Sequence, residues 1–92
     1  MTDDELRSAL RRHALLEGDF LLRSGRRSSH YFDKYRFETR PELLEAIGAR
    51  VSAVVGEHEP AAVRLAGPEL GAVALAAASS LASRLPFLIV RK

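Results

Sequence analysis

The last third of the sequence places the strongest constraint on the fold. An apolar segment, AAVRLAG (61–67), leads into the turn GPELG (67–71), an alanine-rich stretch and a second apolar segment, PFLIVRK (86–92). Two apolar segments separated by a helix are typical of a βαβ unit, with parallel strands and a right-handed crossover. Parallel strands usually lie within larger sheets, whereas this chain provides two. The sequence therefore predicts the front part of an α/β domain.

The N-terminal region predicts a helix and a β-hairpin. Thr2 begins a capping box, apolar residues follow at helical intervals, and Gly18 is the expected stop, so residues 3–17 should form an amphipathic helix. Two strands are expected around the turn RSGRRSS, the first starting at Phe20 and the second covering 30–37.

Residues 41–58 predict the longest helix. Their apolar side chains follow helical spacing, and Pro41 is tolerated in a first turn. Thr39 and Glu42 have the spacing of a second capping box. Pro60 is expected to end this helix, and no linker or repeat divides the chain.

Composition narrows the functional class. The chain has 92 residues, a formal charge of +2, 47% hydrophobic and 28% charged residues, and no cysteine. These values predict a single globular domain over 1–92, without disulfides or thiolate metal sites, in a reducing cytoplasm. No apolar run approaches the ~20 residues of a membrane span, and the acidic start is unlike a secretion signal. The small net charge does not favour a nucleic-acid binder.

The stretch RSGRRSSHYFDKYRF (23–37) combines cations with aromatic rings. Arg23, Arg26 and Arg27 could clamp a diphosphate through paired hydrogen bonds, although charge runs are also typical of solvated turns. Tyr31 and Phe32 are neighbours on an expected strand, so their rings should point to opposite faces. One ring could stack on a planar base while the other packs in the core, and the sequence leaves open which does which.

The turn GPELG lies where a strand passes into a helix. Glycines at this position allow a ligand to approach the backbone, and the N–H groups of a helix N-terminus favour anions. The alternative is that Gly67 and Gly71 only permit close packing of the strand and the helix. Glu69 would repel a phosphate if it pointed inward, so the turn matches neither a Walker nor a Rossmann fingerprint.

Taken together, the segments GDFLLRSGRRSSHYFDKYRFE, AGPELGAVALA and LPFLIVRK resemble the N-terminal half of the orotate phosphoribosyltransferases. The resemblance covers nearly the whole chain. It implies a type I phosphoribosyltransferase (Rossmann-like) α/β fold, here truncated after an N-terminal helix, a β-hairpin and the first βαβ unit. The implied reaction transfers phosphoribose from 5-phosphoribosyl 1-diphosphate to orotate, giving orotidine 5′-monophosphate and diphosphate in UMP (pyrimidine) biosynthesis.

The resemblance also implies roles for individual residues. Tyr31 and Phe32 stand where the family has an aromatic pair beside orotate. Residues expected to bind the phosphoribosyl donor are Arg23, Glu69, Leu70, Arg91 and Lys92. Arginine at position 23 replaces a lysine that is common in the family, which keeps the charge but changes its geometry. No residue is assigned a catalytic or metal-ligating role.

Further expectations follow from the resemblance. Mg²⁺ would bind through the donor's diphosphate, and the protein would be a cytoplasmic homodimer with shared active sites and no nucleic-acid or membrane partner. The acidic segment that binds the ribose and the metal in this family is absent, so the 92-residue chain alone is expected to be inactive.

Two alternatives remain open. The chain could be a non-catalytic nucleotide-binding fragment or an assembly partner of the same fold. A nucleic-acid module using the arginine turn and the rings is also conceivable, but the mixed charge of the helices disfavours it.

Overall fold

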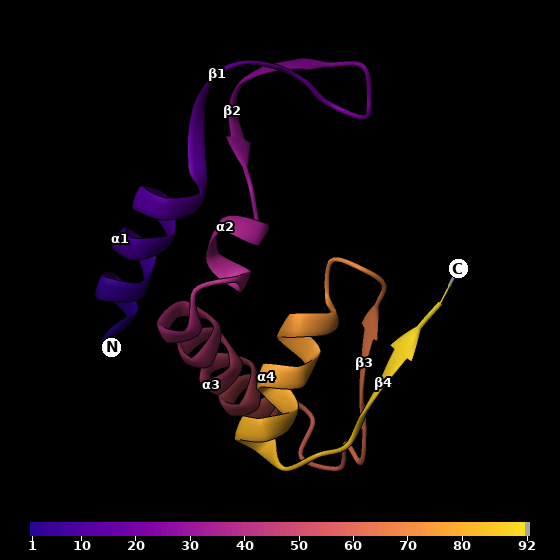
Figure 1. Ribbon diagram of the computed structural model, residues 1–92. Helices are drawn as coiled ribbons and strands as arrows, with labels where there is room; N and C mark the ends of the chain where they lie inside the picture. Colours follow the sequence, from indigo (N-terminus) through magenta and orange to yellow (C-terminus); the bar gives the residue numbers. More distant parts are fainter. Residues whose placement is uncertain (92) are drawn as a thin grey trace.

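The computed structural model describes residues 1–91, which form four helices and two small sheets (Figure 1). The first half of the described chain contains a helix, a hairpin and a short helix. The second half contains a long helix followed by a strand, a helix and a strand. In order, the elements are α1 (Asp3–Ala14), β1 (Leu15–Leu21), β2 (Arg27–Phe32), α2 (Tyr35–Glu38), α3 (Pro41–His58), β3 (Leu65–Pro68), α4 (Val73–Ser83) and β4 (Phe87–Val90).

The predicted βαβ unit is confirmed. Strands β3 and β4 pair in parallel, from Leu65 opposite Phe87 to Pro68 opposite Val90, and α4 connects them. Helix α4 packs between this sheet and α3 (Figure 1). The first strand is shorter than expected and begins at Leu65, because β4 offers partners for four residues only.

Close approach of backbones holds this half together. A methyl group at Gly67 would lie 2.7 Å from the Cβ of Ala76 and 2.8 Å from the carbonyl oxygen of Ala72. A methyl group at Gly48 in α3 would lie 2.7 Å from the carbonyl oxygen of Ala78 in α4. Glycine at both positions therefore lets α4 pack directly on β3 and on α3.

The first helix ends earlier than predicted. It stops at Ala14 rather than at residue 17, because residues 15–17 pair with residues 30–32 of β2. Gly18 therefore lies inside β1, where the register shifts between Glu17 and Phe20, and it does not end a helix. The predicted hairpin itself is confirmed, with β1 and β2 antiparallel.

The second strand is also shorter than the predicted 30–37. The backbone N–H of Asp33 donates to the Ala14 carbonyl (2.9 Å), and its side chain accepts from the N–H of Tyr35 (3.1 Å). These bonds turn the chain into α2.

The predicted helix over 41–58 is confirmed, but its predicted capping box is wrong. The hydroxyl of Thr39 donates to the carbonyl of Tyr35 (2.6 Å), and Arg40 is the N-cap of α3 without a side-chain hydrogen bond.

The core lies where α1, α2 and α3 meet. Its buried apolar members are Leu6, Ala9, Ala14, Phe37 and Leu43. Leu10, Ala46, Ile47 and Leu75 pack against this cluster, and Leu75 extends it to α4.

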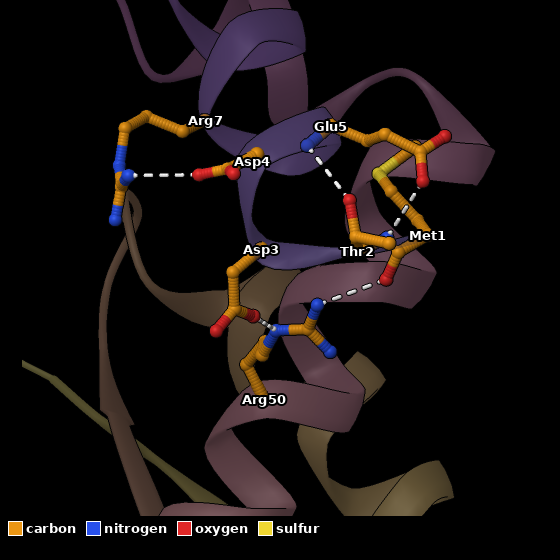
Figure 2. A network of polar contacts seen from close by, with 7 residues as sticks. All are labelled: Met1, Thr2, Asp3, Asp4, Glu5, Arg7 and Arg50. Carbon is orange, nitrogen blue, oxygen red and sulfur yellow. Dashed lines mark hydrogen bonds and ion pairs between the residues drawn. The ribbon is translucent and has the colours of Figure 1, made fainter.

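A polar network fastens the start of α1 to α3 (Figure 2). The predicted capping box is present, because the N–H of Glu5 donates to the Thr2 hydroxyl and the N–H of Thr2 donates to the Glu5 carboxylate, both at 3.1 Å. The hydrogen bonds from Thr2 lower the pKa of Glu5. From α3, Arg50 donates to the carbonyl of Met1 (2.9 Å), and its Nε lies 2.6 Å from the carboxylate of Asp3.

Candidate functional site

The carboxyl edge of the parallel sheet gathers part of the predicted site. Pro68 and Val90 are opposite each other at the ends of β3 and β4, so the turn after Pro68 and the residue after Val90 share one edge. The N–H of Glu69 donates to the carbonyl of Val90 (2.9 Å), which fixes the start of the turn. Glu69, Leu70 and Arg91 are exposed there. Lys92, predicted for the same site, lies outside the described residues.

The turn leads directly into α4. No side chain caps the first turn of this helix, and its N-cap is Ala72. The N-terminus of an α-helix carries a partial positive charge and favours anions. The edge therefore combines a glycine turn, a helix N-terminus and the exposed cation Arg91.

The arginine turn lies at the tip of the hairpin. Arg23 is exposed beside Gly25, whose φ of 88° belongs to the left-handed region that glycine tolerates. Arg27 donates to Asp19 on the opposite strand (2.9 Å), so its charge is already paired. Arg23 forms no ion pair with a carboxylate of residues 1–91. No hydrogen bond within that range joins it to the GPELG turn.

The two adjacent aromatic rings of β2 have different neighbours. The Tyr31 ring lies 5.6 Å from the ring of Phe20, between centroids, whereas the Phe32 ring lies 5.5 Å from that of the buried Phe37. Both side chains are about half exposed. Phe32 thus borders the core, and Tyr31 extends a separate aromatic pair on the hairpin.

Lys34 connects these two regions, and sequence reasoning missed it. Its side chain extends from the residue before α2 to Gly71 in the turn. A methyl group built on Gly71 would overlap the Nζ atom of Lys34 and would lie 2.6 Å from its Cε. The available signal was that a chain with twelve arginines has lysine at only two positions, and one of them directly follows the Tyr31-Phe32-Asp33 segment.

A buried carboxyl lies on the same short helix. Glu38 is 5% exposed, and its Oε1 atom has no hydrogen-bond partner among residues 1–91. Burial raises the pKa of Glu38, and the nearby ammonium of Lys34 partly opposes this rise. The Lys34 ammonium therefore lies near both Gly71 in the turn and the carboxyl of Glu38, the last residue of α2.

One surface hollow, about 190 Å³, reaches the turn through Gly67 and Ala72. Another, about 700 Å³, lies between α3 and α4 and is lined mainly by alanine and leucine. Within residues 1–91, no group of three histidines or acidic residues is arranged to hold a metal ion. None of the helices in that range is long and apolar enough to cross a bilayer.

The sequence matches no protein-family model. It does match individual curated proteins, and these matches are consistent. The orotate phosphoribosyltransferase of Methanocella arvoryzae is 46% identical over 92 residues, covering 98% of this chain and 50% of the relative. That of Halobacterium salinarum is 44% identical over 90 residues, covering 97% of this chain and 49% of the relative. The chain thus spans about half the length of the curated relatives it matches.

Solved structures agree with these matches. The structure of Leishmania donovani UMP synthase is similar with a TM-score of 0.82 and 33% identity, over 99% of this chain and 20% of the other. The orotate phosphoribosyltransferase of Aeropyrum pernix gives a TM-score of 0.78 at 31% identity, over 94% of this chain and 52% of the other.

Proposed function

Because this chain belongs to the orotate phosphoribosyltransferase family, as its motifs predict, and spans about half of a member's length, we propose that the protein catalyses that family's reaction. The reaction transfers phosphoribose from 5-phosphoribosyl 1-diphosphate to orotate, giving orotidine 5′-monophosphate and diphosphate. The observation that carries the proposal is the 46% identity over 98% of the chain. A likeness of this extent includes both the hairpin and the GPELG turn.

The sheet edge is proposed to bind the donor. Backbone groups at Glu69 and Leu70 would face its diphosphate beside the N-terminus of α4, and Arg91 would add positive charge from the adjacent strand. As the bond between the sugar and diphosphate breaks, negative charge grows on the leaving group. Fixed positive groups and dipoles stabilise that charge in the transition state. Lys92 is proposed for the same role from the sequence alone.

The hairpin is proposed to supply the remaining contacts. Arg23, which has no ion-pair partner within residues 1–91, would bind a donor phosphate through a charge-assisted hydrogen bond. Phe32 borders the core through Phe37, so Tyr31 is the ring that we assign to stacking on orotate.

The metal and the assembly belong to the same proposal. Mg²⁺ would bind through the donor's phosphate oxygens, as the resemblance implies, and we assign no step to it. The protein is proposed to act in the cytoplasm as a homodimer with shared active sites, as the resemblance implies.

Turnover of two forms of the protein tests the function. The 92-residue chain mixed with orotate, the donor and Mg²⁺ should give no product. The same chain continued to the full length of its relatives should form orotidine 5′-monophosphate. Absence of product from the full-length protein would contradict the proposed reaction. Product from residues 1–92 alone would contradict the need for the missing half.

A further inference from the structure

We propose that Lys34 is an additional donor-binding residue, and that Gly71 is small in order to leave room for its ammonium at the turn. The proposal rests on the proposed function, because the anion it names is the diphosphate of the phosphoribosyl donor. It adds a residue from outside the turn to that binding site.

The first step is that the position of Lys34 is fixed by its backbone. Asp33 is bonded to the carbonyl of the fully buried Ala14 (2.9 Å). The carbonyl of Lys34 accepts from the N–H groups of Phe37 (3.1 Å) and Glu38 (2.9 Å). The side chain therefore leaves a fixed junction between β2 and α2, so the backbone that carries it needs no further ordering when an anion binds.

The second step is that the exposed ammonium lies beside a helix N-terminus, where an anion is favoured. It contacts Gly71, two residues before the first residue of α4, close to the positive end of the helix dipole. No carboxylate within residues 1–91 forms an ion pair with it. The centroid of the Tyr35 ring lies 5.8 Å from the Nζ atom of Lys34, near the limit of a cation–π contact. Phosphate oxygens at the turn would satisfy both the ammonium and the dipole.

The third step separates Gly71 from Gly67. At Gly67 a methyl group would meet the Cβ of Ala76 and the carbonyl of Ala72, so that glycine serves packing. At Gly71 the three nearest atoms all belong to the far end of the Lys34 side chain. A flexible side chain can move away, so Gly71→Ala should displace the ammonium while leaving the fold and the charge in place.

The competing explanation is that Lys34 only balances the buried carboxyl of Glu38. That role predicts a loss of thermal stability in Lys34→Met without a change in donor affinity. The donor-binding role predicts weaker donor binding in Lys34→Met with little change in melting temperature. Measuring both quantities therefore distinguishes the two roles.

The test is calorimetric titration of the full-length protein with the donor, without orotate, and separately with inorganic diphosphate. Lys34→Met and Gly71→Ala should each weaken donor binding about tenfold to a hundredfold, the range of one charge-assisted bond. The double variant should bind no more weakly than Lys34→Met, because Gly71→Ala acts through the ammonium. Gly56→Ala in α3, where nothing lies within 4 Å of the added methyl group, is the matched control and should bind as the unaltered protein does.

Several results would overturn the inference. Unchanged donor affinity in Lys34→Met would do so, as would Gly71→Ala weakening binding equally with and without Lys34. Should Lys34→Met fail to fold, unchanged affinity in Gly71→Ala alone would be decisive. If the unaltered protein bound diphosphate through Lys34 but not the donor, the proposed function would fail and the anion role of Lys34 would stand. If it bound neither, both would fail.

Discussion

The two small sheets hold their strands together by different means. Strands β1 and β2 are joined by one tight turn at Gly25, and most of their side chains are exposed. Strands β3 and β4 are parallel and pair only because α4 returns the chain, with Gly67 and Gly48 allowing the backbones to approach. Apart from Phe32, which packs against Phe37, side chains of the hairpin can therefore be changed at little cost in stability, whereas those of the packed half cannot. We expect substitutions in the hairpin to affect ligands and substitutions in the packed half to affect folding.

The largest expected effect tests the packed half. Leu43 in α3 is 1% exposed and belongs to the core cluster. Leu43→Ala should lower the free energy of unfolding by about 2–5 kcal/mol, because it removes buried apolar contacts and leaves a cavity. Urea denaturation of the full-length protein measures this. Leu81→Ala is the control, since Leu81 is 72% exposed and should cost far less. Equal costs would mean that the core is not where the structure places it.

The next effect tests the hairpin as a ligand-binding element. Arg23→Ala should weaken donor binding by about 1.5–3 kcal/mol, as expected for the loss of one charged hydrogen bond, with little change in melting temperature. Arg27→Ala is the matched control, because Arg27 is already paired with Asp19. Titration calorimetry compares the two. If both variants bound the donor as tightly as the unaltered protein does, the arginine turn would be a solvated loop.

Tyr31 and Phe32 test the same comparison within one strand, because one ring is assigned to the ligand and the other to the core. Tyr31→Ala should raise the KM for orotate, because it removes the proposed stacking of about 1–3 kcal/mol, and it should leave melting little changed. Phe32→Ala should instead lower the melting temperature, because its ring packs against Phe37. Steady-state kinetics and thermal melts of both variants separate these effects. The reverse assignment would place orotate on the Phe32 face.

The smallest expected effect is the pH dependence of stability that comes from Glu38 at the end of α2. Because burial raises the pKa of Glu38 above its ordinary value of 4.5, the folded protein holds that proton more tightly than the unfolded chain. Protonated Glu38 therefore contributes its full stabilisation of the fold below pH 4.5. That stabilisation is lost as the pH rises through the raised pKa of Glu38 in the folded protein. Glu38→Gln should raise the melting temperature at neutral pH and lose that advantage in acid. The exposed Glu45 supplies the control Glu45→Gln, and a benefit of Glu38→Gln that does not vary with pH would contradict the explanation.

The sequence predicted the parts of the fold that depend on local patterns. The βαβ unit and the helix over 41–58 followed from apolar spacing and turn residues. The end of α1 and the start of α2 did not, because they are set by pairing between residues 15–17 and 30–32 and by a bond from Asp33 to Ala14. Such partners are distant in sequence, and local propensity cannot identify them.

The candidate site likewise has a part that the sequence predicted and a part that it did not. Glu69, Leu70 and Arg91 were predicted from the resemblance of their segments to the family, and the structure brings them to one edge of the sheet. Lys34 was not predicted, because its contact with Gly71 joins two segments whose relative position depends on the packing of α2, α3 and α4. Sequence spacing carries no information about a contact of that kind.

The network around Arg50 also sets an order of events during synthesis of the chain. The capping box of Thr2 and Glu5 is local, so the start of α1 can form as soon as these residues leave the ribosome. The bond from Arg50 to the carbonyl of Met1 spans 49 positions. The first helix therefore lacks this contact until the residues through Arg50 have been translated. A nascent-chain chaperone would find its exposed surface in that interval.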